Sequence, residues 1–281
     1  MILPARKFIT FLVPLLMLVC IDVSEGKADN VWAKDPITGC EIWAGEGVKE
    51  GEVDSWSGQC ENGKAAGVGV LNYFSNGKLI ARYQGQMKAG KADGYGVLDY
   101  WLDSGYDHYE GQFKDGALNG DGVYVESDGS RYEGDFKNNK PDGFGIYKGA
   151  DGAWFQGELK DGLPNGEGFD GNSSGEEYRG QYVNGKRQGQ GTVIYPDGGE
   201  YTGEFKDGEP EGKGIYESPD GGKYEGTFKN GLANGPGTYT DINGDVLKGN
   251  FVNGFPDGKV VVTKKDGTNE EQIWKDGKQA K

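Results

Sequence analysis

Residues 201–216 read YTGEFKDGEPEGKGIY, and this pattern recurs through most of the chain. If Tyr201 is counted as position 1, segments of the same type follow one another every 23 residues. They begin at Tyr109, Tyr132, Phe155, Tyr178, Tyr201, Tyr224 and Leu247, and looser copies begin at Trp56 and Tyr83. Similarity at a fixed period indicates a repeat architecture, in which each repeat packs mainly against its neighbours.

Each repeat alternates with a period of two, which is the period of a β-strand. Positions 1, 3 and 5 are aromatic, glycine and bulky, as in Tyr109, Gly111 and Phe113, whereas positions 2, 4 and 6 are polar. Asp-Gly or Asn-Gly follows at positions 7 and 8, and these pairs favour a two-residue hairpin turn. A second strand is expected over positions 12–16. A second turn, often Asp-Gly at positions 20 and 21, then leads to the next repeat.

The glycines at positions 3, 12 and 14 are expected on the aromatic face, so that the rings at positions 1, 5 and 16 can lie over the backbone. The sequence does not distinguish between hairpin registers that differ by two residues. Proline at position 10, as in Pro141 and Pro210, has no N–H and is expected in the loop. The repeat 155–177 carries Asp170 where position 16 is usually tyrosine, which predicts a distorted second strand.

Several of these pieces resemble the MORN repeat family, above all Tyr132-Glu-Gly-Asp-Phe136, Asp142-Gly-Phe-Gly145 and Tyr201-Thr-Gly-Glu-Phe205. The start of the repeat region, Gly39-Cys-x-x-Trp43 and Trp56-Ser-Gly-x-Cys60, is similar to exported bacterial members. The resemblance implies an all-β fold, an elongated single-layer antiparallel sheet of tandem β-hairpins. The expected organisation is a signal peptide (1–28), an N-terminal cap (29–55), nine repeats (56–269), and a partial repeat with a C-terminal cap (270–281).

The N-terminus has the pattern of an export signal. Arg6 and Lys7 precede the apolar run Phe8–Ile21, which is shorter than the ~18 residues needed to span a bilayer. The chain is therefore expected to be periplasmic or secreted, with an uncleaved anchor as the alternative. Cleavage removes Cys20, and the remaining pair, Cys40 and Cys60, predicts a disulfide outside the cytosol. Two free thiols are the alternative if the chain is not exported.

The composition excludes several classes of function. The chain has 30 Lys and Arg against 45 Asp and Glu, a net charge of −15, which argues against nucleic-acid binding because that needs basic phosphate contacts. The single histidine, His108, has no catalytic motif around it, and no Cys/His cluster has zinc spacing. The segment Asp241–Asp245 lacks the spaced glutamate of a calcium loop. No enzymatic activity, cofactor or metal is predicted.

Binding is the remaining class of function. We expect an exported scaffold that binds another protein at the cell envelope. A groove lined by position-16 tyrosines could take an apolar helix or an extended chain; its candidate residues are Tyr124, Tyr147, Tyr216 and Tyr239. The resemblance implies protein scaffolding or membrane association, and the acidic charge favours a protein. The alternatives are a phospholipid membrane surface and a cell-wall polysaccharide.

Overall fold

The computed structural model describes residues 31–45, 55–75, 77–102, 105–275 and 277–280. The predicted signal peptide lies outside these residues. Every helix or strand assigned within them is a β-strand, so the all-β prediction of antiparallel hairpin repeats is confirmed. The chain divides into two compact units, an N-terminal unit that ends at Leu163 and a C-terminal unit that begins at Pro164. Each is described by itself.

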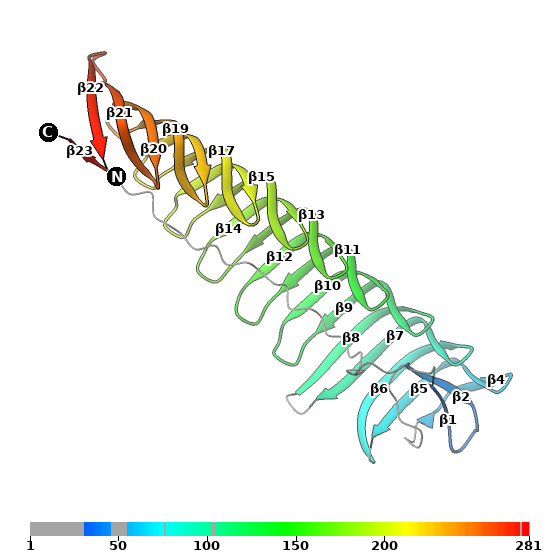
Figure 1. The fold of residues 1–281 in the computed structure, drawn as a ribbon. Coiled ribbons are helices and arrows are strands. Elements are labelled where there is room, and N and C mark those ends of the chain that lie inside the picture. The colour runs from blue at the N-terminus through cyan, green and yellow to red at the C-terminus, as the bar shows by residue number, and fades with distance from the viewer. Residues whose placement is uncertain (1–30, 46–54, 76, 103–104, 276, 281) are drawn as a thin grey trace. The chain divides into compact units, whose positions relative to one another are not determined.

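The strands of the N-terminal unit follow one another in chain order, each antiparallel to the next from β5 onward (Figure 1). They are β1 (Val31–Lys34), β2 (Glu41–Gly45), β3 (Ser55–Trp56), β4 (Gln59–Glu61), β5 (Lys64–Ser75), β6 (Lys78–Lys88), β7 (Lys91–Leu102), β8 (Gly105–Lys114), β9 (Ala117–Val125), β10 (Arg131–Lys137), β11 (Lys140–Lys148) and β12 (Trp154–Lys160).

The C-terminal unit repeats the same meander. Its strands are β13 (Leu163–Gly171), β14 (Glu177–Val183), β15 (Lys186–Ile194), β16 (Glu200–Lys206), β17 (Glu209–Glu217), β18 (Lys223–Lys229), β19 (Leu232–Thr240), β20 (Val246–Val252), β21 (Phe255–Thr263), β22 (Asn269–Lys275) and β23 (Lys278–Gln279).

The hairpin register is fixed by the glycines at positions 3 and 14. In the hairpin β16–β17, Gly203 pairs with Gly214, and Tyr201 pairs with Tyr216. The register then shifts through a bulge, so that Phe205 pairs with Pro210. The turn at positions 7 and 8 has positive φ at both residues, 53° at Asp207 and 95° at Gly208, as a type I′ turn requires.

The tyrosine at position 1 packs directly on these two glycines. A Cβ on Gly203 would lie 2.5 Å from Tyr201 Oη, and one on Gly214 would lie 2.4 Å from Cε2 of the same ring. The Tyr201 hydroxyl donates a hydrogen bond of 2.9 Å to the carbonyl of Glu204, inside the bulge. The side chain is only 1% exposed. A single layer can bury such a ring because the hairpins are strongly curved (Figure 1) and the glycines leave room for it.

Edge-to-face contacts connect these rings from repeat to repeat. Tyr201 contacts Phe205 of its own repeat at 5.3 Å and Phe228 of the next repeat at 4.7 Å, measured between ring centroids. Tyr109 makes the same two contacts, with Phe113 at 5.1 Å and with Phe136 at 5.3 Å. Such pairs contribute about 0.5–1.5 kcal/mol beyond their buried area. Each repeat is therefore stabilised by its successor.

Two details of the predicted hairpin are wrong. Position 10 lies inside the second strand and is buried, as at Pro210, rather than in the loop. Its carbonyl accepts a hydrogen bond of 3.0 Å from the amide of Gly231, in the turn of the next repeat. The glycine at position 12 does not lie under the rings, because a Cβ on Gly212 would meet the Glu204 side chain.

The repeat 155–177 is regular, and the distortion predicted for its second strand is not found. β13 runs without interruption from Leu163 to Gly171, and Gly168 pairs with Gly180 as in other repeats. In the last full repeat a smaller residue, Leu247, occupies position 1. There Val260 at position 14 fills the space of the missing ring, since its Cγ1 would lie 2.5 Å from a Cβ on Gly249.

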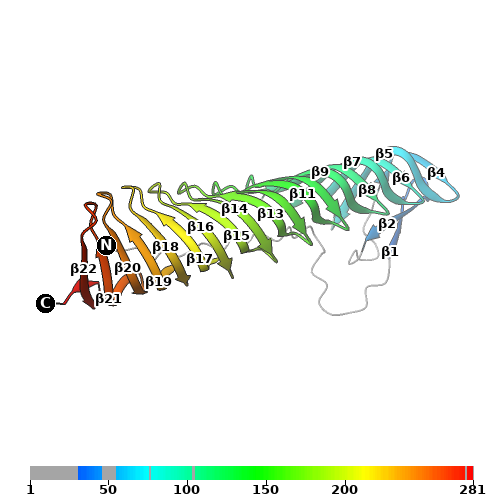
Figure 2. The same cartoon turned by 90° about the horizontal axis from the view of Figure 1, so that it is seen from above.

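The N-terminal residues form a small hairpin, β1–β2, beside the repeat strands (Figure 2). It lies along two successive repeat turns, because the amides of Glu41 and Trp43 donate hydrogen bonds of 2.8 Å to the carbonyls of Gly63 and Gly90. The predicted disulfide Cys40–Cys60 is present, with Cα atoms 5.8 Å apart. It anchors this hairpin to β4, which lies within the first repeat.

Replacing a glycine that lies under a tyrosine ring should destabilise the protein. Gly191→Ala places a methyl group 2.6 Å from Cε2 of Tyr178, and we expect the free energy of unfolding to fall by about 1–3 kcal/mol. The matched control is Gly198→Asn, at a turn with φ of 86° and no neighbour within 4 Å, where asparagine is tolerated. Urea denaturation followed by circular dichroism measures both. Equal midpoints would contradict the packing of rings on glycines.

Candidate functional site

The tyrosines expected to line a groove are largely interior residues. The exposed fractions of Tyr124, Tyr147 and Tyr216 are only 5–7%, and Tyr239 is partly buried. The Tyr124 hydroxyl donates a hydrogen bond of 2.5 Å to Asp107, and Tyr216 Oη would lie 2.7 Å from a Cβ on Gly199, in the preceding long turn. These rings fill the space beneath the turns, so they do not line an open groove.

Large apolar side chains are instead exposed on the opposite face of the strands. Side chains at positions 2, 4, 13 and 15 point to this face, which we call the open face. At position 13, Tyr95 and Phe144 are each 53% exposed, and Val68 is 71% exposed. Two aromatic rings half exposed on one sheet face are unusual for a residue type that normally dominates cores and interfaces. This face of the N-terminal unit is the candidate binding surface.

Two rows of side chains cross β7–β12 on the open face. Cross-strand pairing places Tyr95 opposite Gln112, Asp121 opposite Asp135, and Phe144 opposite Glu158. In the neighbouring row, which runs from Val97 to Gln156, apolar and polar side chains alternate. We call these two rows the open-face patch; its members are Tyr95, Gln112, Asp121, Asp135, Phe144, Glu158, Val97, Glu110, Val123, Glu133, Ile146 and Gln156.

The C-terminal unit uses the same positions differently. There Gln190 lies opposite Glu204, and Pro236 lies opposite Asn250. Lys213 lies opposite Thr227. The backbone amide of Lys213 donates a hydrogen bond of 3.4 Å to the Glu204 carboxylate. Because no aromatic residue occupies position 13 in this unit, the exposed rings belong to the N-terminal unit.

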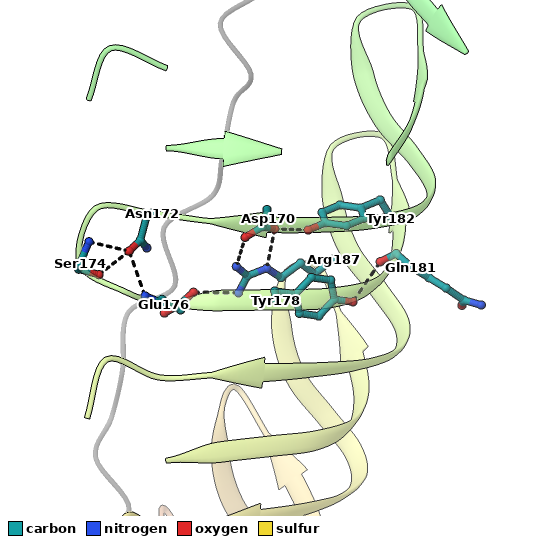
Figure 3. A network of polar contacts seen from close by, with 8 residues as sticks. All are labelled: Asp170, Asn172, Ser174, Glu176, Tyr178, Gln181, Tyr182 and Arg187. Atoms are coloured by element: carbon teal, nitrogen blue, oxygen red, sulfur yellow. Dashed lines mark hydrogen bonds and ion pairs between the residues drawn. The ribbon is translucent and has the colours of Figure 1, made fainter. Parts of the chain in front are cut away.

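The C-terminal unit contains a buried charged cluster at the junction of two repeats (Figure 3). Asp170 replaces the usual tyrosine at position 16 and is 2% exposed, and Arg187 replaces proline at position 10 of the next repeat and is 5% exposed. Arg187 donates to Asp170 from Nη2 at 2.6 Å and to Glu176 from Nη1 at 2.9 Å. Its guanidinium also lies 4.5 Å from the centroid of the Tyr178 ring.

Every strong hydrogen-bonding group of this cluster has a partner. The Tyr182 hydroxyl donates to Asp170, and burial followed by the neighbouring Asp170 charge raises the pKa of Tyr182. Burial lowers the pKa of Arg187, but Asp170 outweighs it, so that the pKa of Arg187 is raised overall. Asp170 and Glu176 belong to one repeat and Arg187 to the next, so the buried ion pairs connect two repeats. We therefore assign the cluster a structural role.

Other ionisable groups lie near the long turns. Burial, with repulsion from Asp128 and Asp107, raises the pKa of Glu126 to about 7. His108 Nδ1 lies 2.7 Å from Asp99 Oδ1.

Within the part of the chain that the structure describes, no group of three or more His, Cys, Asp or Glu residues could hold a metal ion. No helix among the described residues is long and apolar enough to cross a bilayer.

Comparison with known proteins identifies the repeats. The MORN repeat model matches eight segments, residues 83–100, 109–131, 132–154, 155–169, 178–200, 201–223, 224–246 and 248–268. The chain belongs to the MORN repeat family. The structure shows what the MORN pattern encodes here, since its Tyr-x-Gly-x-Phe segment supplies the ring, the glycine beneath it and the contact to the next repeat. No curated protein matches the sequence.

Two solved structures show distant similarity to this chain. The TCP10 domain of CPAP from Danio rerio has 12% identity and a TM-score of 0.38, covering 72% of this chain and 93% of that chain. The TCP domain of SAS-4 from Drosophila melanogaster, solved with a proline-rich motif of Ana2, has 11% identity and a TM-score of 0.29, covering 63% and 84%. With TM-scores below 0.5, neither similarity bears on the function of this MORN protein.

Sequence reasoning missed both the open-face patch and the buried cluster. The signal for the patch is position 13, where Tyr95 and Phe144 are the only aromatic residues among the nine repeats. The signal for the cluster is a pair of departures in consecutive repeats, Asp170 at position 16 followed by Arg187 at position 10. Both signals are visible only after the register shows which positions are neighbours.

Removing one member of the buried pair should be severe, whereas replacing the whole cluster should not. Arg187→Met leaves the Asp170 carboxylate buried without its cation, and we expect a loss of about 3–5 kcal/mol in the free energy of unfolding. The quadruple variant Asp170→Tyr, Glu176→Ala, Tyr182→Phe and Arg187→Pro installs the residues of neighbouring repeats and should be as stable as the wild type. Urea denaturation followed by circular dichroism measures the stability of both variants. A quadruple variant as unstable as Arg187→Met would contradict this account.

The pKa of Glu126 predicts a pH dependence. It is raised from 4.5 to about 7 in the folded chain, so the folded state binds the extra proton between these values. The free energy of unfolding should therefore fall as pH rises through this window. Glu126→Gln removes the titration. The difference in stability between this variant and the wild type should grow in favour of the variant from pH 5 to pH 8. A difference independent of pH would contradict the prediction.

Proposed function

We propose that this MORN-repeat protein is an exported, non-enzymatic scaffold that binds another protein at the cell envelope. The observation that carries the proposal is the half exposure of Tyr95 and Phe144 on the open face of the N-terminal unit. Aromatic residues are enriched at the centres of protein interfaces, where they supply large contact areas. The repeat sheet presents them on β7 and β11, with the hairpin β8–β9 between them, and this spacing suits an extended or helical partner segment.

Export is supported by two features of the N-terminal region. The apolar run Phe8–Ile21 follows two basic residues, as in secretory signals. The disulfide Cys40–Cys60 suits an oxidising compartment. A scaffold role without catalysis is supported by the assignment of the buried cluster to structure, since Asp170 and Arg187 are enclosed and mutually paired.

The competing partners are less well matched by the same surface. Five carboxylates on the open-face patch would oppose docking on an anionic membrane. A polysaccharide is the second candidate, because exposed aromatic rings beside carboxylates can stack on sugar rings. Liposome flotation and affinity gels with cell-wall fractions separate these ligands from a protein. Binding to liposomes or glycan without any protein complex would contradict the proposal.

The exposed rings provide the direct test. The purified protein is mixed with a detergent extract of the cell envelope, and captured proteins are identified and then tested in purified form. We expect Tyr95→Ser with Phe144→Ser to weaken the purified complex by at least about tenfold, because two aromatic contacts are lost. The matched control is Val183→Ser with Ile194→Ser, which alters two exposed apolar residues of the C-terminal unit. Equal affinities of the two double variants would contradict the proposal.

A further inference from the structure

The open-face patch carries charge of one sign only. Its acidic members are Glu110, Asp121, Glu133, Asp135 and Glu158, and no lysine or arginine occupies positions 2, 4, 13 or 15 of β7–β12. Within the described residues, Glu133 pairs with Arg131 at 2.6 Å, but the other four carboxylates form no ion pair. Lysines occupy position 6 of the same repeats, at Lys114, Lys137 and Lys160, but among the described residues none of them forms an ion pair with the patch. The patch therefore presents four carboxylates without an ion-pair partner around two exposed rings.

Two of these carboxylates are direct neighbours across strands. Asp121 on β9 lies opposite Asp135 on β10. Like charges placed directly opposite each other destabilise a sheet. Asp135 accepts a hydrogen bond of 2.9 Å from the Phe144 amide, but no cation lies between the two carboxylates among the described residues. A cationic group supplied from outside would relieve this repulsion.

The exposed rings stand next to the carboxylates. Phe144 lies opposite Glu158, and the Tyr95 hydroxyl donates a hydrogen bond to Glu110. A guanidinium can stack on an aromatic ring while it donates hydrogen bonds to a carboxylate. Adjacent strands are ~4.8 Å apart, so six strands span roughly 25 Å, about the length of seven or eight residues of an extended chain.

The C-terminal unit shows that this charge pattern is not a requirement of the repeat. Its open-face positions hold both signs, with Arg179, Lys213, Lys248 and Lys259 set among Glu167, Glu204 and Glu225. The hairpins of both units have the same register. Because the fold tolerates basic residues at these positions, their absence from the patch is a property of that surface alone.

We infer that the open-face patch binds an extended segment rich in arginine and lysine, carried by the protein partner. This inference rests on the proposed function and deepens it by assigning the chemistry of the partner. The basic side chains stack on Tyr95 and Phe144 and neutralise the carboxylates between them, while the apolar side chains of Val97, Val123 and Ile146 contact the rest of the segment.

Fluorescently labelled octa-arginine is a suitable probe, with octa-glutamate as the negative peptide. Fluorescence anisotropy at 50 and 300 mM salt gives the affinity. The patch variant combines Glu110→Gln, Asp121→Asn, Asp135→Asn and Glu158→Gln. The matched control removes four exposed acidic residues elsewhere, by Glu177→Gln, Glu200→Gln, Glu225→Gln and Glu270→Gln. Both variants lose the same charge, and circular dichroism verifies that both are folded.

The expected result is that the patch variant raises the Kd for octa-arginine about tenfold or more, that the control raises it less than about threefold, and that high salt weakens the wild type. Equal effects of the two variants would overturn the inference, because the attraction would then reflect total charge.

Binding of the captured partner to the variants distinguishes failure of this inference from failure of the proposed function. If it tolerates the patch variant but not Tyr95→Ser with Phe144→Ser, protein binding stands and the basic segment is refuted. If it tolerates both, the proposed function itself fails.

Discussion

The structure depends on one packing contact, a tyrosine ring packed against two paired glycines. At Tyr201 the ring covers Gly203 and Gly214, and its hydroxyl closes the adjoining bulge through the Glu204 carbonyl. Any side chain at either glycine would occupy the volume of the ring. The same ring contacts Phe228 of the following repeat, so one residue per repeat stabilises both its own hairpin and the next one.

This arrangement separates stability from recognition. The aromatic residues at positions 1, 5 and 16 pack in the interior, as the burial of Tyr124 and Tyr147 shows. Position 13 points to the other face, and it varies from Tyr95 to Asp121 to Phe144 along the N-terminal unit. Since residues at position 13 do not pack against the core rings, they can vary without loss of the core. Binding chemistry can therefore be carried by the open face alone.

Where a repeat departs from the pattern, the compensation is local. Asp170 at position 16 of β13 is neutralised by Arg187 of β15, and the Tyr182 hydroxyl, from the intervening strand β14, completes the cluster. Leu247 at position 1 is compensated by Val260, which fills the volume of the absent ring. In both cases the compensating residue comes from a nearby strand of the same unit. The repeat 155–177 therefore keeps regular strands instead of the distortion that its sequence suggested.

The 23-residue period, the strand alternation and the Asp-Gly turns determined the fold from sequence alone, because they act between residues close in the chain. The Cys40–Cys60 pairing also followed from the sequence, because only these two cysteines remain after the predicted cleavage. Only the tertiary structure decided which surface is accessible. Curvature closes the aromatic face over Tyr124 and Tyr147, and the register sets Asp121 opposite Asp135 beside exposed rings. Local sequence patterns do not contain these relations, since they depend on how strands of different hairpins are aligned.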